Sequence, residues 1–380
     1  MSDDLLPEGS LLLHVGPHKT GTTAVQSAFF TARDDLAGYG VAYPGRSRTP
    51  IEAVAAITGR GRMTGDPPTS MRTWRRFAAR TRVRGRVVVS NEFLSDADPA
   101  AVRRIVDDLG RERVHVVVTL RRLDRIAASQ WQQYVQNGSG ISWQRWLRGV
   151  LGRSKRQRTP SFWRRHRHDV VVRRWADEVG ADRVRVVVVD DGDPSALLRT
   201  FEAMVGLPAH TLVPEADRQN RSLTWAEAEL LRRFNRSFRA GEGDPRDYRR
   251  LVRLGAVRAL KAAEPPPDAV RPPLPAWALR RLRRRSRRIV RGVRQSGVAV
   301  IGDLDALVVP PPGDQAARRI SEPPPVTPDL VARAVAGVVE ADRDRPERGW
   351  RAAARRVVGM RPGDVLDAVR ARRYARGGRT

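Results

Sequence analysis

Residues 11–23 read Leu-Leu-Leu-His-Val-Gly-Pro-His-Lys-Thr-Gly-Thr-Thr. The apolar run at the start is typical of a short, buried parallel strand. Gly16 and Gly21 then bracket a loop, and Thr22 and Thr23 open a segment of helical character. A strand, a glycine-bracketed loop and a helix in this order predict a loop that holds a phosphate or a similar anion.

The lysine of this loop has an unusual position. In the common phosphate-binding pattern, G-x-x-x-x-G-K-[ST], a lysine follows the second glycine. Here Thr22 holds that position, and Lys19 lies inside the loop. The chain has only two other lysines, Lys155 and Lys261, among 71 lysines and arginines. Because an ammonium group is a compact, mobile charge, we expect Lys19 to reach around a bound anion.

The backbone of the loop supplies the remaining contacts that an anion needs. We expect the N–H groups of residues 17–23 to converge at the start of the helix, whose end adds a partial positive charge. Glycines at both ends permit the backbone angles required. The alternative is an ordinary glycine turn that happens to hold a lysine. The candidate anion-binding residues are Gly16, Pro17, His18, Lys19, Thr20, Gly21, Thr22 and Thr23.

The composition excludes several classes of protein. The 380 residues are 41% hydrophobic, which suffices for one large domain or two ordinary ones. The absence of cysteine rules out disulfides and thiolate chemistry, and with six scattered histidines we expect no metal site. No apolar run approaches the about 20 residues of a membrane span, and the acidic N-terminus does not resemble a secretory signal. We therefore expect a cytoplasmic protein without a transmembrane segment.

The formal net charge of +29 favours anionic partners. This charge comes almost entirely from arginines spread along the chain, without basic repeats interleaved with aromatic residues. Nucleic acid is therefore not the partner we expect. Residues 269–302 contain ten arginines and no acid, together with an apolar stripe of Leu282, Ile289 and Val293. This pattern predicts an amphipathic helix over 275–295 whose arginines face solvent.

Apolar and helical segments alternate along most of the chain. Strands are expected at 10–15, within 38–45, and at 86–90, 113–120, 184–189 and 298–301. Helices are expected at 22–37, 99–109, 124–135, 161–179 and 194–205. The alternation predicts an α/β, P-loop NTPase-like three-layer fold with a central parallel sheet flanked by helices. We expect this domain to span 10–309, with a proline-rich linker and a basic helical C-terminal extension over 310–380.

A second motif follows the strand at 113–120. Arg121 ends that strand, and Ser129 stands eight residues later in the next helix. A guanidinium and a hydroxyl placed in this way suit a phosphate monoester. With the loop at 16–23, the pair resembles the bacterial sulfotransferases that use 3′-phosphoadenosine-5′-phosphosulfate (PAPS), although Trp131 replaces the more usual tyrosine. The resemblance implies PAPS as co-substrate without a metal, its 5′-phosphosulfate on the loop and its 3′-phosphate on Arg121 and Ser129.

A third segment, Val-Val-Val-Ser-Asn-Glu at 87–92, resembles the strand-end S-S-E of the same enzymes. In related heparan-type sulfotransferases a glutamate near the sulfuryl group acts as the base. The resemblance therefore implies that Glu92 takes the proton of the acceptor while Lys19 stabilises the transferring group. His18 is the rival base. A purely structural interpretation is that Glu92 caps the turn that follows the strand.

Other functions and several acceptors remain open. A P-loop kinase or NTPase would use Asp190 and Asp191, which follow the apolar strand at 184–189. A nucleic-acid binder would use the arginine-rich helix. For a sulfotransferase, the acceptor would be a hydroxyl or amine of a glycan, a lipid or a small metabolite. The segments 44–75 and 136–160 are expected to line it, and they carry Trp74, Trp143 and Trp146.

Overall fold

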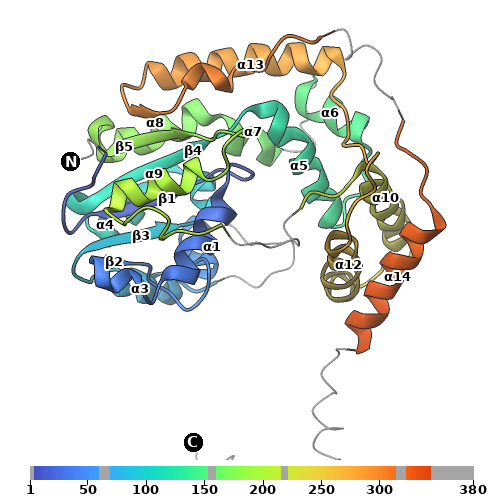
Figure 1. Cartoon of the computed structure of the whole chain (residues 1–380), viewed down its shortest axis with the longest axis horizontal. Coiled ribbons are helices and arrows are strands. Elements are labelled where there is room, and N and C mark those ends of the chain that lie inside the picture. The colour runs from blue at the N-terminus through green and yellow to red at the C-terminus, as the bar shows by residue number, and fades with distance from the viewer. Residues whose placement is uncertain (1–3, 60–68, 153–159, 215–220, 314–321, 344–380) are drawn as a thin grey trace, which may run out of the picture.

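The protein is described by a computed structural model, which covers residues 4–59, 69–152, 160–214, 221–313 and 322–343. Its centre is a six-stranded parallel sheet with the order β2-β3-β1-β4-β5-β6 (Figure 1). The strands are β1 (Leu11–Val15), β2 (Val41–Ala42), β3 (Arg86–Ser90), β4 (Val114–Leu120), β5 (Val184–Val188) and β6 (Ala299–Ile301). All six strands expected from the sequence are present, and the predicted α/β class is confirmed.

The first strand occupies the position that matters most for function. β1 lies between β3 and β4, with Leu11 opposite Val87 on one side and Val114 on the other. The chain therefore crosses over from β1 in both directions, which makes the carboxyl end of β1 a switch point of the sheet. Ligands of open parallel sheets bind at such points.

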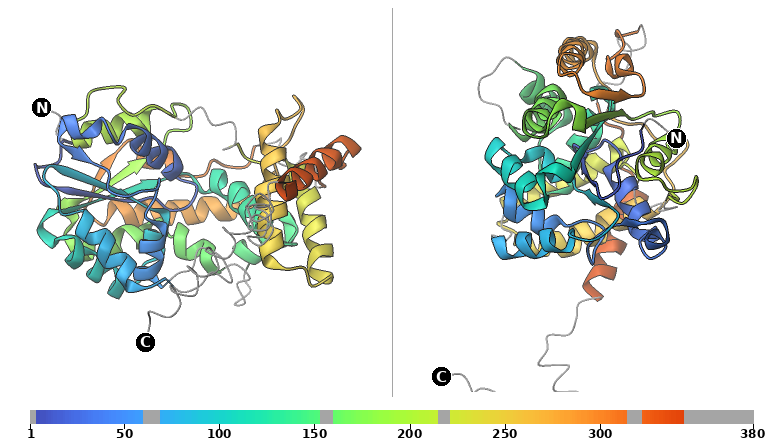
Figure 2. Two further views of the ribbon diagram at one scale, coloured as in Figure 1. Left: turned by 90° about the horizontal axis from the view of Figure 1, so that it is seen from below. Right: turned by 90° about the vertical axis from the view of Figure 1, so that its left-hand side faces the viewer.

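Helices cover both faces of the sheet (Figure 2). One face packs against α1 (Thr22–Ala32) and α9 (Ala196–Val205), and the other against α4 (Pro99–Leu109) and α8 (His168–Val179). Side chains of a strand alternate between the two faces. Leu12 accordingly belongs to the first core, while its neighbours in β1 belong to the second. Burial on both faces explains why the central strands are almost wholly apolar.

A second, mainly helical region adjoins this sheet at the ends of its strands (Figure 1). α13 packs on α8, α5 and α6, α10 packs on α5, and α14 packs on η6 and α12. The elements are α5 (Leu123–Gln136), α6 (Trp143–Leu151), α7 (Pro160–His166), α10 (Trp225–Ala240), α11 (Pro245–Asp247), the π-helix η6 (Tyr248–Ala256), α12 (Val257–Ala262), α13 (Ala276–Arg294) and α14 (Pro328–Arg343). Two helices near β2 and β3 complete the set, α2 (Ile51–Thr58) and α3 (Met71–Arg80).

Three details differ from the sequence-based expectation. The first helix ends at Ala32 instead of residue 37, because Asp34 and Asp35 would place negative charge at the negative end of the helix. The helix expected at 161–179 is divided at Arg167, which leaves helical geometry with a ψ of 72°. The last strand, expected at 298–301, is β6 (Ala299–Ile301); it pairs with β5 at the sheet edge, and its Val300 is 36% exposed.

The amphipathic arginine-rich helix is confirmed as α13. Leu282, Ile289 and Val293 are all at most 3% exposed, and they hold the helix on the second core. Of the C-terminal extension, 314–321 and 344–380 lie outside the described residues. None of the helices in the described ranges is both long and apolar enough to cross a lipid bilayer.

Candidate functional site

The loop after β1 folds tightly against its own helix. A Cβ on Gly16 would lie 2.1 Å from the Thr22 hydroxyl oxygen, so no larger residue fits there. Gly21 has a φ of 89°, which a glycine adopts without strain, while Lys19 has a φ of 70°, which is costly for a residue with a side chain. The Thr22 hydroxyl donates to the Gly16 carbonyl at 3.0 Å. Such strained backbone is typical of functional loops.

The amide groups of this loop have few partners. Pro17 has no N–H, so the expectation that all of residues 17–23 donate is wrong at that residue. The Thr20 amide donates to the Pro17 carbonyl at 3.2 Å. Within the described residues, no hydrogen-bond acceptor is found for the amides of five loop and helix-start residues, which are His18, Lys19, Gly21, Thr22 and Thr23. Gly21 caps α1 without a side-chain hydrogen bond, which leaves the positive end of the helix open to an anion.

Lys19 is held over the loop by α5. Its Nζ donates to Oε1 of Gln133 at 3.0 Å. Burial, together with the charges of Lys261, Arg121 and Arg253, lowers the pKa of Lys19 from 10.5 to about 8. The nearby Glu92 carboxylate opposes this shift.

These neighbours were not all expected from the sequence. Lys261 comes from α12 and Arg253 from η6, so the helical region contributes positive charge that acts on the loop. The rarity of lysine was the one available signal for Lys261. Lys155 lies outside the described residues. Gln133 stands four residues after Ser129, on the same face of α5, and that spacing was its signal.

Glu92 begins a short turn, η2 (Glu92–Asp96), directly after β3. The cap of this turn is Asn91, whose Oδ1 accepts from the Phe93 amide at 2.8 Å. The alternative in which Glu92 caps the turn is therefore wrong. Its Oε2 accepts instead from Nε2 of Gln26 on α1 at 3.2 Å, which directs the carboxylate towards the helix that follows the loop.

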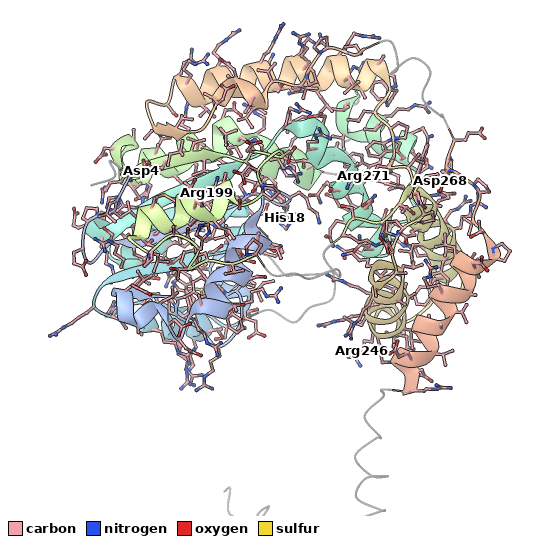
Figure 3. The ribbon with its side chains drawn as sticks, viewed as in Figure 1. Asp4, His18, Arg199, Arg246, Asp268 and Arg271 are labelled. Atoms are coloured by element: carbon pink, nitrogen blue, oxygen red, sulfur yellow. The ribbon has the colours of Figure 1, made fainter. Side chains whose placement is uncertain are left out.

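His18 lies where β1 ends (Figure 3). Its ring packs edge-on against Phe93 with 4.9 Å between centroids, and its buried Nε2 has no partner among the described residues. Burial, together with the charges of Arg165 and Lys19, holds the pKa of His18 well below its usual value. The ring is therefore neutral near pH 7, and its low basicity makes it a weak proton acceptor.

Arg121 lies beside the loop, as the sequence predicts, but it has a carboxylate partner. Its Nη1 donates to the Lys19 carbonyl at 3.4 Å, and its Nε and Nη2 contact Oδ1 of Asp191 at 2.7 and 2.6 Å. Arg125 also reaches Asp191, at 3.3 Å. Ser129 is half-buried, and its hydroxyl forms no hydrogen bond with any described residue.

The two aspartates after β5 have structural partners. Asp190 accepts from the Gly192 amide at 2.7 Å, which closes a tight turn, and Asp191 pairs with the two arginines just described. Over the described ranges, no three histidine, aspartate or glutamate side chains gather closely enough to hold a metal ion.

The three tryptophans expected near an acceptor belong to the core. Trp74, Trp143 and Trp146 are at most 2% exposed. Nε1 of Trp74 donates to Asp108 at 2.6 Å, and Nε1 of Trp143 donates to the Pro273 carbonyl at 2.7 Å. The expectation that they line an acceptor site is wrong.

A buried polar cluster lies beneath the loop and was not predicted from the sequence. His14, in β1, contacts the Ser90 hydroxyl through Nδ1 at 2.8 Å and the Thr119 hydroxyl through Nε2 at 3.1 Å. The hydroxyls of Thr119 and Thr20 are 2.8 Å apart. Burial lowers the pKa of His14 to about 3, so its ring is neutral.

Comparison with known proteins gives one structural similarity. No protein-family model and no curated protein matches the chain. Among solved structures, a sulfotransferase from Alicyclobacillus acidocaldarius is similar over 63% of this chain and 98% of its own, with 18% sequence identity and a TM-score of 0.39. A similarity at this level does not transfer an activity to the chain.

Proposed function

We propose that the protein is a sulfotransferase that uses PAPS as the sulfuryl donor. The observation that carries this proposal is the set of five amides without an acceptor among the described residues, in the loop that also carries the Lys19 ammonium, at the switch point of the sheet. Donors in this arrangement fit an anion with several oxygens. Arg121, which contacts the Lys19 carbonyl, would supply a guanidinium and Ser129 on α5 a hydroxyl for a second phosphate.

Different residues of the site would bind the two ends of PAPS. Residues 16–23 would hold the 5′-phosphosulfate, mainly through amides and through the exposed Thr23 hydroxyl, because the Thr22 hydroxyl already donates to Gly16. Arg121 and Ser129 would hold the 3′-phosphate. Arg121 must then exchange its Asp191 partner for the phosphate, so the aspartate acts as a competitor that keeps the guanidinium in place beforehand.

Glu92 is the residue that would remove the proton from the sulfuryl acceptor. Its carboxylate lies within electrostatic range of Lys19 and is oriented by Gln26. When bound, PAPS supplies a sulfuryl group joined to a phosphate leaving group, so a bond from sulfur to the acceptor oxygen or nitrogen replaces the bond to that phosphate. Glu92 receives the acceptor proton, and Lys19 offsets the negative charge on the leaving side. The Nε2 atom of His18 is buried, whereas Glu92 is partly exposed, and this difference favours Glu92 as the base.

The contacts of two aspartates favour this function over a P-loop kinase or NTPase. Such an enzyme would use a strand-end aspartate to hold magnesium. Asp190 instead closes a turn, and Asp191 pairs with Arg121 and Arg125. The acceptor remains a proposal at the level of a hydroxyl or amine on a glycan, a lipid or a small metabolite. The cytoplasmic location and the 10–309 domain boundary likewise stay predictions.

Ligand binding and transfer test the proposal in turn. We expect adenosine 3′,5′-bisphosphate to raise the melting temperature, while ATP with magnesium does not. Incubation with PAPS carrying labelled sulfur and a panel of glycan, lipid and phenolic acceptors then gives a labelled product. Lys19→Met abolishes both effects, and Arg103→Ala, an exposed change on α4, preserves them. A selective response to ATP with magnesium would overturn the proposal.

A further inference from the structure

Four buried side chains form a continuous chain of hydrogen bonds beneath the anion-binding loop. Ser90, His14, Thr119 and Thr20 come from β3, β1, β4 and the loop itself, and each is 0% exposed. The links measure 2.8, 3.1 and 2.8 Å in that order. A Cβ on Gly16 would lie 2.8 Å from His14 Nε2 and 3.0 Å from the Thr119 hydroxyl, so the chain lies directly under the start of the loop.

The hydrogen bond at the end of this chain decides which group donates and which accepts in every other hydrogen bond. The Thr20 hydroxyl donates to the Pro17 carbonyl at 2.7 Å, which uses its only hydrogen. Thr119 must therefore donate to Thr20, and the proton between His14 and Thr119 must come from His14 Nε2. In a neutral ring Nδ1 is then an acceptor, and it receives the Ser90 hydroxyl hydrogen.

We infer that His14 is a positioning residue of the anion-binding loop, fixed as the neutral Nε2–H tautomer, and that it sets the loop through Thr119 and Thr20. The chain ends on the Pro17 carbonyl, which also accepts the Thr20 amide at 3.2 Å. In a trans peptide the carbonyl and the following N–H point in opposite directions. Holding the Pro17 carbonyl inward therefore turns the His18 amide, one of the five without an acceptor, outward towards a ligand.

The position of His14 explains why a histidine suits this site. The residue must accept a hydrogen bond on one side and donate on the other, at full burial, without carrying charge. A glutamine has the same two groups but lacks a rigid ring, and the His14 ring also packs on Phe201 with 4.8 Å between centroids. An aliphatic residue would leave the buried Ser90 hydroxyl without its acceptor and the Thr119 hydroxyl without its donor, so that Thr119 would keep only its hydrogen bond to Thr20.

The first test is spectroscopic and needs no ligand. Protonated and unprotonated ring nitrogens have widely separated ¹⁵N shifts, so a protein labelled with [¹⁵N]histidine reports each tautomer. We expect the His14 signal, assigned by its loss in His14→Gln, to show a protonated Nε2 and an unprotonated Nδ1 at pH 7. A protonated Nδ1 would overturn the inference, whatever the protein binds.

The second test measures binding of adenosine 3′,5′-bisphosphate and so rests on the proposed function. Thr119→Val breaks the chain and is expected to weaken binding about tenfold, which corresponds to about 1.4 kcal/mol. Thr119→Ser restores the hydroxyl and should bind within about threefold of the parent protein. Thr81→Val removes a buried hydroxyl that donates to the Ala78 carbonyl, about 60 residues along the chain from the loop, and should have no effect.

The outcomes of these two tests distinguish the proposed function from the positioning role of His14. If the parent protein binds neither the bisphosphate nor inorganic sulfate but shows the expected tautomer, the proposed function fails and the hydrogen-bond chain stands. If the parent protein binds and Thr119→Val binds equally well, the positioning role of His14 is refuted. If Thr119→Val does not fold, Ser90→Ala serves instead. It removes the donor to Nδ1, and a His18 amide resonance unmoved by that change would also refute the role.

Discussion

Replacing Lys19 by methionine should make the unliganded protein more stable while it destroys the anion site. Lys19 is protonated at pH 7 in both folded and unfolded chains, but burial and neighbouring cations lower its folded pKa from 10.5 to about 8. A difference of about 2.5 units at about 1.36 kcal/mol each means that the buried charge costs about 3 kcal/mol. The lost contact to Gln133 costs about 1 kcal/mol. We therefore expect a net gain of about 2 kcal/mol.

The pH dependence distinguishes this cause from a packing effect. Below pH 8 the charge is present in both states, so the full cost applies. Between pH 8 and 10.5 the folded protein loses the proton while the unfolded chain keeps it, and the advantage of Lys19→Met should shrink as the pH rises.

Urea unfolding at pH 7, 9 and 10 measures the difference. Lys19→Arg is the matched control, because it keeps a cation in the loop and should show no gain. Bisphosphate titration completes the experiment, since the methionine variant should lose binding and at least about 10²-fold in turnover. A methionine variant that is less stable than the parent at pH 7, or whose advantage is the same at pH 10, would refute the reasoning.

Three further predictions concern the base, the competitor and the buried histidines. Glu92→Gln should lower turnover by about 10²-fold or more and leave the bisphosphate dissociation constant, measured by calorimetry, within about threefold; unchanged turnover would exclude Glu92 as the base. Asp191→Asn should tighten binding of adenosine 3′,5′-bisphosphate relative to adenosine 5′-phosphate in the same calorimetric titration, because Arg121 loses its carboxylate partner, and an unchanged ratio would contradict the competition. Burial lowers the pKa values of His14 and His168 to about 3 and about 4, so between pH 6.5 and 5 both rings take up protons only when the protein unfolds. Each histidine should therefore remove about 2 kcal/mol of stability as the pH falls from 6.5 to 5. A melting temperature that stays constant over this range in scanning calorimetry would contradict this prediction.

The sequence predicted the elements that are formed by residues adjacent in the chain. The strand, loop and helix around Gly16 and Gly21 follow from residues adjacent in the chain, and all six strands could be found from their apolar runs. The placement of Arg121 beside the loop was implied by the resemblance to PAPS-dependent sulfotransferases, and it agrees with the rule that parallel strands end at the same edge of a sheet.

Contacts between distant segments could not be predicted in this way. His14, Ser90 and Thr119 meet only because the parallel register of three strands brings them together, and each alone looks like any polar residue in a buried strand. Asp191 resembled a magnesium ligand until its pairing with Arg121 was known. Tryptophans failed as indicators because large aromatic side chains suit a core as well as a binding site.

The features that define the loop all oppose folding of the unliganded chain. Lys19 carries a buried charge in a left-handed conformation, several amides lack acceptors, and nearby cations from α12 and η6 repel the ammonium. An anion with several oxygens would offset the buried charge, the repulsion between the cations and the lack of acceptors for the amides, but not the backbone strain at Lys19. A sheet with two well-packed cores tolerates such a loop. The support beneath it is fully hydrogen-bonded from Ser90 to Pro17, so the strain stays in the residues that face the ligand.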